Sequence, residues 1–125
     1  DQTSEELKFK QETQKILGIR GLRASVTCTS VPVITGHSIS IEARFRKSVT
    51  TDEAWETLSY ARGVELSGIP TPINAAGGDV SLVGRIRQSG VFGHLGLSLF
   101  VTGDNLRKGA ALNAVQIAES LQRSY

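Results

Sequence analysis

Hydrophobic and polar positions alternate with a period of two in several stretches of this chain. The alternation is clearest in residues 22–30, 37–46 and 95–102, and residues 80–88 precede the last of these across a Gly-rich turn. A period of two predicts half-buried β-strands, apolar on one side. Residues 64–66 are apolar at both ends and predict only a short strand.

Three other stretches have the spacing of amphipathic helices, and two of them open with a capping box. Thr3 precedes Glu6 and Thr50 precedes Glu53, so each hydroxyl is followed three residues later by a carboxylate. This pairing satisfies free backbone donors at a helix start. The last helix, residues 107–121, is apolar over a wide face, and we expect it to pack on more than one surface.

The order helix, two strands, helix, short strand, two strands, helix predicts an α+β fold. We expect a mixed, mostly antiparallel sheet with helices packed on one face. The length of 125 residues and the 39% apolar content suit one domain with its own core. No internal repeat or linker divides residues 1–125.

Charge and cysteine content narrow the function classes. Fourteen basic and twelve acidic residues are interspersed and leave a net charge of +2, which argues against a nucleic-acid or membrane-surface partner. No apolar run approaches the roughly 18 residues of a membrane helix. Cys28 is the only cysteine, so an internal disulfide is excluded and a reducing, cytoplasmic location is expected.

The strongest candidate for chemistry is the turn at residues 31–38. Gly36 can adopt a backbone conformation closed to other residues, and His37 follows it directly at a strand end. Histidine titrates near neutral pH, which suits an acid–base group. The alternative is a partly buried, hydrogen-bonded strand residue. Ser38 and Asp79 would complete a hydrolytic triad, but no nucleophile-elbow motif surrounds them, and we discount it.

Two further features each have a functional and a structural interpretation. Cys28 falls on the apolar side of a predicted strand, where we expect a buried, inert thiol rather than a nucleophile. In residues 103–109, free backbone donors and two cations at a helix start suit an anion. The alternative there is that Asp104 or Asn105 is simply the helix N-cap. His94, in a Gly-rich loop, is expected to be exposed, and two distant histidines make a weak metal site.

Several sequence runs, spread over nearly the whole chain, carry a resemblance to one enzyme family. The runs are Glu-Glu-Leu-Lys at 5–8, Val-Pro-Val at 31–33, Thr-Gly-His-Ser at 35–38, Pro-Thr-Pro at 70–72, Val-Gly-Arg-Ile-Arg at 83–87 and Gly-Asp-Asn-Leu-Arg-Lys-Gly-Ala-Ala-Leu-Asn at 103–113. With these runs in this order, the sequence resembles the carboxy-terminal domain of aspartate-semialdehyde dehydrogenase, a domain like that of glyceraldehyde-3-phosphate dehydrogenase.

The resemblance implies an NADP-dependent oxidoreductase. Enzymes of this family reduce aspartyl phosphate to aspartate semialdehyde and release phosphate, on the route to lysine, threonine and methionine. The resemblance implies that His37 is the acid–base partner of a cysteine nucleophile. It also implies that Glu5 holds the substrate amino group, that Lys8 binds phosphate and that Asn105 contacts the nicotinamide end of the cofactor.

Two departures from the family pattern qualify these expectations. The nucleophile and the Gly-rich nucleotide-binding loop belong to an amino-terminal domain outside these 125 residues, which binds most of the NADP. We therefore expect this chain alone to be inactive. Ser30 stands where the family carries an arginine that clamps the substrate carboxylate, and a hydroxyl cannot supply that charge.

The resemblance also implies a homodimer in which this domain supplies the interface through its sheet. Two alternatives stay open. One is a non-catalytic paralogue that acts as a dimerisation or binding module, with Ser30 marking the decay of a site. The other is a reductase of N-acetylglutamyl phosphate, which the run at residues 104–113 argues against.

Overall fold

The computed structural model describes residues 1–122, and the chain divides into two compact units. The first unit is Asp1–Pro32 and the second is Val33–Tyr125. All the strands belong to the second unit.

The first unit is built on helix α1, Ser4–Leu17. The predicted capping box is confirmed: the Thr3 side chain accepts from the Glu6 amide and the Glu6 side chain accepts from the Thr3 amide. The Thr3 amide, followed by that of Cys28, holds the pKa of the Glu6 carboxyl below its ordinary value. Gly18 ends the helix in the left-handed conformation, with φ of 64°.

The strand predicted at residues 22–30 is wrong. This segment is extended, and Leu22, Ala24 and Val26 are half-buried in alternation, but it joins no sheet ladder. Its backbone groups bond to α1 side chains instead, because Gln14 donates to the Leu22 carbonyl and Glu6 accepts from the Cys28 amide. Cys28 is exposed, so the prediction of a buried strand thiol is also wrong.

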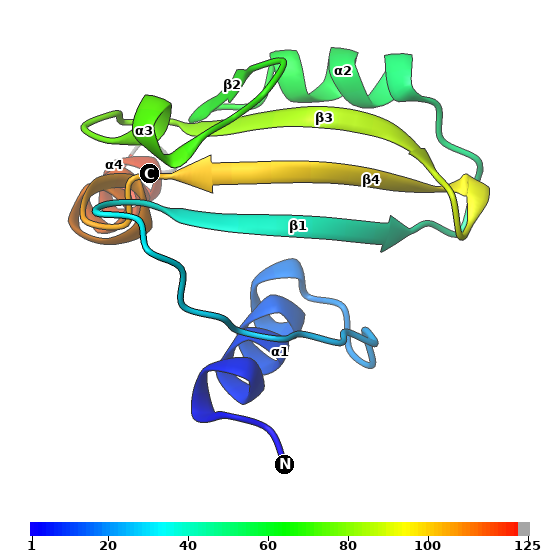
Figure 1. Cartoon of the computed structure of the whole chain (residues 1–125), viewed down its shortest axis with the longest axis horizontal. Helices are drawn as coiled ribbons and strands as arrows, with labels where there is room; N and C mark the ends of the chain where they lie inside the picture. The colour runs from blue at the N-terminus through cyan, green and yellow to red at the C-terminus, as the bar shows by residue number, and fades with distance from the viewer. Residues whose placement is uncertain (123–125) are drawn as a thin grey trace. The chain divides into compact units, whose positions relative to one another are not determined.

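The second unit is a four-stranded mixed sheet in the order β1-β4-β3-β2, which confirms the predicted fold class (Figure 1). The strands are β1, His37–Arg44; β2, Val64–Leu66; β3, Ser81–Ser89; and β4, Gly93–Gly103. β4 pairs antiparallel with both β1 and β3, whereas the short β2 pairs parallel with β3. The first and last pairs of the β1–β4 register are His37 with Gly103 and Arg44 with Gly96.

Strand β3 is interrupted by a register shift between Gly84 and Arg87. Arg85, inside the shift, has a φ of 53°, the only non-glycine residue among residues 1–122 with a positive φ. A Cβ at Gly84 would lie 1.8 Å from the Ser67 carbonyl oxygen, so only glycine lets the segment after β2 cross this strand. The bulge therefore bends the sheet beside the crossing segment.

The helices of the second unit lie along the sheet and at one of its ends (Figure 1). Helix α2, Thr51–Ser59, opens with the predicted Thr50 and Glu53 capping box and contacts β2 and β3. The short helix α3, Pro72–Ala75, contacts β4. The last helix begins irregularly as η1, Arg107–Ala111, with a kink at Ala110, and continues as α4, Leu112–Gln122.

The buried core of the described chain is small. Its apolar members are Ala54, Ala75, Leu82, Val83 and Leu97. The two faces of the sheet differ, because Ile39, Ile41 and Ala43 of β1 alternate with Ser38, Ser40 and Glu42. We call the face that carries Ser38, Ser40, Glu42, Ser98 and Thr102 the polar face.

Candidate functional site

His37 is the first residue of β1, and its side chain is exposed. The preceding Gly36 is buried and has a φ of 107°, a conformation that favours glycine. A Cβ there would lie 3.3 Å from Pro72 Cβ and 3.4 Å from the Gly103 carbonyl oxygen. The prediction of a glycine turn that holds an imidazole at a strand end is confirmed, and the alternative of a partly buried histidine is wrong because the side chain is exposed.

The carbonyl of His37 is held from the neighbouring strand. Thr102 Oγ1 donates a hydrogen bond of 3.0 Å to the His37 carbonyl oxygen and accepts one of 3.1 Å from Ser38 Oγ. Thr102 is only 1% exposed and is the largest fully buried side chain of residues 1–122. Because the buried Thr102 hydroxyl has both a donor and an acceptor partner, it is held in one orientation, and this end of the sheet is rigid.

Asn105, just after β4, is brought next to His37 by a hydrogen bond to the turn. The Gly36 amide donates to Asn105 Oδ1 over 2.8 Å. Because a backbone amide can only donate, its partner must be the side-chain oxygen and not Nδ2. Nδ2 has no hydrogen-bond partner within residues 1–122 and keeps its two donors for another group.

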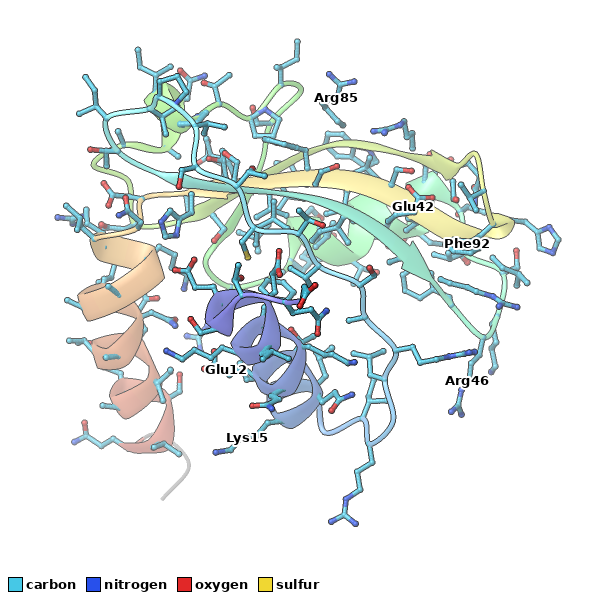
Figure 2. All side chains as sticks on the ribbon, turned by 60° about the horizontal axis from the view of Figure 1, so that its bottom comes forward. Glu12, Lys15, Glu42, Arg46, Arg85 and Phe92 are labelled. Carbon is cyan, nitrogen blue, oxygen red and sulfur yellow. The ribbon has the colours of Figure 1, made fainter. Side chains whose placement is uncertain are left out.

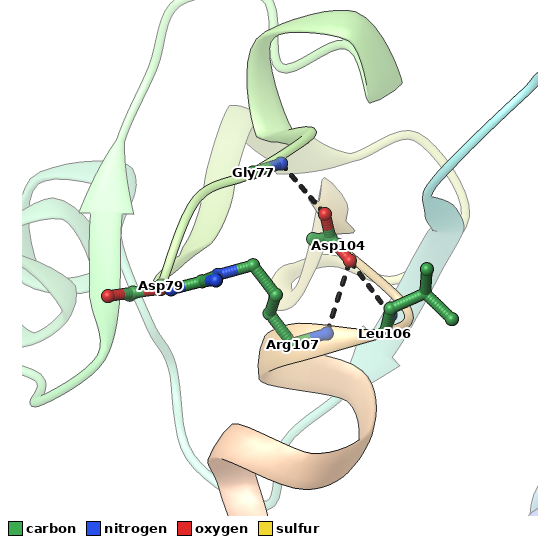
Figure 3. A network of polar contacts seen from close by, with 5 residues as sticks. All are labelled: Gly77, Asp79, Asp104, Leu106 and Arg107. Atoms are coloured by element: carbon green, nitrogen blue, oxygen red, sulfur yellow. Dashed lines mark hydrogen bonds and ion pairs between the residues drawn. The ribbon is translucent and has the colours of Figure 1, made fainter.

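Asp104 determines the shape of the segment that carries Asn105 (Figure 3). Its carboxylate, only 4% exposed, accepts from the amides of Gly77 at 2.7 Å, Leu106 at 2.8 Å and Arg107 at 3.1 Å. The Gly77 amide, then that of Leu106, holds the pKa of this carboxyl below its ordinary value. The Asp104 carboxylate, and not the Asn105 side chain, accepts from the first amides of the last helix, although the N-cap residue itself is Leu106, which makes no side-chain cap bond. Because Asp104 occupies the Leu106 and Arg107 amides, these two donors are not free for an anion, and a polar ligand at Asn105 stays a prediction.

Asp79 pairs with Arg107 and not with His37, so the structure does not form the hydrolytic triad of Ser38, His37 and Asp79. Its carboxylate forms an ion pair with Arg107, from both Nε and Nη2 of the guanidinium (Figure 3). Both side chains are about half exposed, at 57% and 49%, so the pair contributes little to stability. His94 is exposed at the start of β4, as expected.

Glu5 and Lys8 belong to the first unit and lie three residues apart on α1. Both side chains are exposed, and helical spacing places them on one face. The polar side of the helix also carries Glu12 and Lys15 (Figure 2). The four predicted site residues therefore fall into two pairs, one in each unit, and the meeting of the pairs stays a prediction.

A second polar cluster surrounds Glu42 on the polar face, and sequence reasoning missed it (Glu42 is labelled in Figure 2). Ser89 Oγ and Ser98 Oγ both donate to the Glu42 carboxylate. Both serines are buried, and the bond from Ser89, then that from Ser98, holds the pKa of Glu42 below its ordinary value. The one available signal was polar residues at alternating positions of neighbouring strands, which in a sheet become cross-strand pairs.

Other kinds of site find little support. Among residues 1–122, no three histidine, cysteine or acidic side chains come together as a metal site. Within the same residues, no helix has the length and apolar content to cross a membrane.

The fold and the turn before β1 define a class of protein: an α+β domain that presents the exposed imidazole of His37 on a backbone held by Thr102 and Asn105. The family model described as "Semialdehyde dehydrogenase, dimerisation domain" matches residues 1–108, and the chain belongs to this family. The resemblance inferred from the sequence motifs is confirmed.

Named relatives agree with this family. Over 121 residues the chain is 57% identical to an aspartate-semialdehyde dehydrogenase of Corynebacterium glutamicum, and over 119 residues it is 58% identical to that of Streptomyces akiyoshiensis. These matches cover 96% and 95% of this chain but only 35% of each relative. The chain thus spans about a third of the length of the curated relatives it matches.

A solved structure has the same fold. Aspartate semialdehyde dehydrogenase II from Vibrio cholerae, in a crystal structure "complexed with ASA", superposes with a TM-score of 0.90 at 41% identity. The match covers 99% of this chain and 38% of that one. This agreement supports the α+β, glyceraldehyde-3-phosphate-dehydrogenase-like class.

Proposed function

We propose that this chain is part of an NADP-dependent oxidoreductase that converts aspartyl phosphate to aspartate semialdehyde, a step towards lysine, threonine and methionine. The observation that carries the proposal is the exposed His37 side chain at the end of β1, beside a hydrogen-bonded Asn105. The names of the relatives, all dehydrogenases of this aldehyde, support the same substrate class.

His37 acts as the acid–base group of the reaction. The imidazole takes the proton of an attacking cysteine thiol, which lies outside these 125 residues, because the thiolate is the nucleophile. The imidazolium formed can return that proton later in the cycle. Cys28 does not match the family's nucleophile in the resemblance, and it lies on the extended segment that follows α1.

Glu5 and Lys8 bind the two charged ends of the substrate. A carboxylate attracts the substrate amino group, and an ammonium attracts phosphate. The exposed side chains share a face of α1, which supports their joint use.

Asn105 is suited to contact the nicotinamide end of the cofactor. Its Oδ1 is occupied by Gly36, while its Nδ2 has no hydrogen-bond partner within residues 1–122 and suits a carboxamide oxygen. NADPH supplies the hydride when bound, and most of its contacts belong to residues outside this chain. We infer that the relatives' additional two thirds contain that nucleotide-binding part.

The proposal is tested in the full-length protein that carries this chain. With aspartate semialdehyde, phosphate and NADP, we expect the formation of NADPH, measured by its absorbance, and less with NAD. The isolated 125-residue chain is the matched control, and we expect it to form none. Absence of turnover by a folded full-length protein would refute the proposed function.

We also infer that two copies associate through the polar face of the sheet. The matched family is described as a dimerisation domain. The polar face carries the exposed Ser40 together with the exposed Arg87 from β3, so a hydroxyl and a basic group are available for a contact between two copies. Arg87→Glu should convert a dimer to a monomer in sedimentation velocity, whereas Arg62→Glu, in the turn between α2 and β2, should not.

The second candidate is a non-catalytic dimerisation module, and Ser30 is the observation that favours it. Ser30 is exposed and cannot clamp a carboxylate as an arginine does. A dimeric full-length protein that binds neither NADP nor substrate would support this candidate over the enzyme.

A further inference from the structure

The main chain on both sides of His37 is held by side chains at the carboxyl end of β4. On the amino side, the Gly36 amide donates to Asn105 Oδ1 over 2.8 Å. On the carboxyl side, Thr102 Oγ1 donates to the His37 carbonyl over 3.0 Å. The imidazole itself has no hydrogen bond to any of residues 1–122.

These two contacts are themselves anchored. Thr102 is 1% exposed and its hydroxyl also accepts from Ser38 Oγ. Asn105 follows Asp104, whose buried carboxylate accepts from three backbone amides and fixes the turn after β4. The side chains that hold the main chain beside His37 are therefore fixed by further hydrogen bonds, while the imidazole ring makes none within residues 1–122.

We propose that Thr102 and Asn105 are positioning residues that fix the imidazole of His37 by holding the backbone on either side of it. The inference rests on the proposed function, in which His37 is the acid–base group. Acid–base chemistry depends on placement, and a displacement of about 1 Å can cost up to about a hundredfold in rate. Neither Thr102 nor Asn105 Oδ1 needs to touch the substrate for this effect.

Thr102→Val tests the carboxyl-side contact in the full-length protein, because valine keeps the shape and removes the hydroxyl. We expect kcat to fall about ten- to a hundredfold, with KM for substrate and cofactor nearly unchanged. Thr102→Ser, which keeps the donor, should restore most of kcat. Ser38→Ala is the matched control, since it removes the other hydroxyl of the cluster and leaves the His37 carbonyl bonded.

Substitutions of Asn105 test the contact on the amino side of His37. Two variants distinguish the role of its side-chain oxygen from that of its side-chain nitrogen. Asn105→Asp keeps an oxygen for the Gly36 amide and removes the amine, whereas Asn105→Leu removes both. In nuclear magnetic resonance spectra, the Gly36 amide should keep its hydrogen-bonded shift in Asn105→Asp and lose it in Asn105→Leu. The His37 ring resonances should move in Asn105→Leu and Thr102→Val but not in Ser38→Ala.

The outcomes separate this inference from the proposed function. Ring shifts in a full-length protein without turnover would refute the proposed function and keep the positioning role. The positioning role is overturned if Thr102→Val, folded and with wild-type unfolding behaviour, keeps kcat within about twofold and leaves the His37 ring resonances in place. It is also overturned if Thr102→Ser is as slow as Thr102→Val, because the hydroxyl would then be irrelevant. Should Thr102→Val not fold, unchanged ring resonances in Asn105→Leu overturn it instead.

Discussion

The two polar clusters of the sheet use their hydrogen bonds in opposite ways. At the end of β1 that begins with His37, Thr102 and Asn105 bond to the main chain, and the imidazole stays exposed. Further along β1, Ser89 and Ser98 bond to the Glu42 carboxylate itself. The first arrangement fixes a position and frees a side chain, whereas the second occupies the side chain. Under the proposed function, the first cluster serves the chemistry and the second serves stability.

The largest effect is expected from His37→Ala in the full-length protein. Loss of a positioned acid–base group should lower kcat about 10²- to 10⁴-fold. The side chain is exposed, so the unfolding temperature should stay close to that of the wild type. His94→Ala, the same change at an exposed histidine outside the site, should leave kcat and the unfolding temperature unchanged. An equal loss of kcat in the two variants would contradict a special role for His37.

Ser30→Arg should have the next largest effect, and it tests how the site binds the carboxylate of the substrate. A guanidinium forms a charge-assisted bond worth about 1.5–3 kcal/mol with a carboxylate, so KM for aspartate semialdehyde should fall about tenfold or more. Ser30→Gln is a neutral control of similar reach. An unchanged KM in the arginine variant would count against the explanation that Ser30 lacks a carboxylate clamp.

Glu42→Gln should separate stability from activity. The amide keeps the shape but loses the charge that accepts from two buried hydroxyls, so the unfolding temperature should fall. Turnover should stay within about twofold, because the substitution leaves the contacts around His37 intact. Thermal unfolding and steady-state kinetics on one preparation provide both readings, and a large loss of turnover at full stability would reverse the assignment of the two clusters.

The smallest expected effect is a change in how the stability of the protein depends on pH under acidic conditions. Glu42 has a lowered pKa in the folded state, from bonds by Ser89 and then Ser98, so it binds its proton more readily when unfolded. The Glu42 carboxylate therefore adds to the free energy of unfolding above its pKa in the unfolded chain. This addition is lost as the pH falls through the pKa of Glu42 in the folded chain. Wild-type stability should therefore decline below about pH 5, and Glu42→Gln should show a shallower decline in denaturant titrations. Parallel curves would mean that Glu42 is not selectively stabilised as a carboxylate.

Local patterns predicted the parts of the fold that local chemistry determines. The two capping boxes, at Thr3 and Thr50, formed because each needs only residues three apart. The hairpin of β3 and β4 formed where alternating runs flank a Gly-rich turn. Residues 22–30 have the same alternation, yet the Leu22 carbonyl and the Cys28 amide bond to α1 side chains, a choice that depends on tertiary partners and not on periodicity.

The residues of the candidate site could be named from the sequence, but the contacts that hold them could not. His37 after Gly36 was readable from the chain, because a turn glycine next to a histidine is a local feature. Thr102 lies 65 residues from His37 in sequence, and only the β1–β4 register brings its hydroxyl to that carbonyl. From the sequence, Asp104 and Asn105 were equal candidates for the helix cap, and only the structure shows that the Leu106 and Arg107 amides bond to the Asp104 carboxylate.

The account depends most on His37 being the group that exchanges a proton with the reaction. The pH dependence of kcat/KM in the full-length protein, for the wild type and His37→Ala side by side, tests this directly. We predict a wild-type profile with an ionisation that disappears in the variant, leaving a low and flatter curve. A variant that keeps the wild-type shape and height would contradict the account.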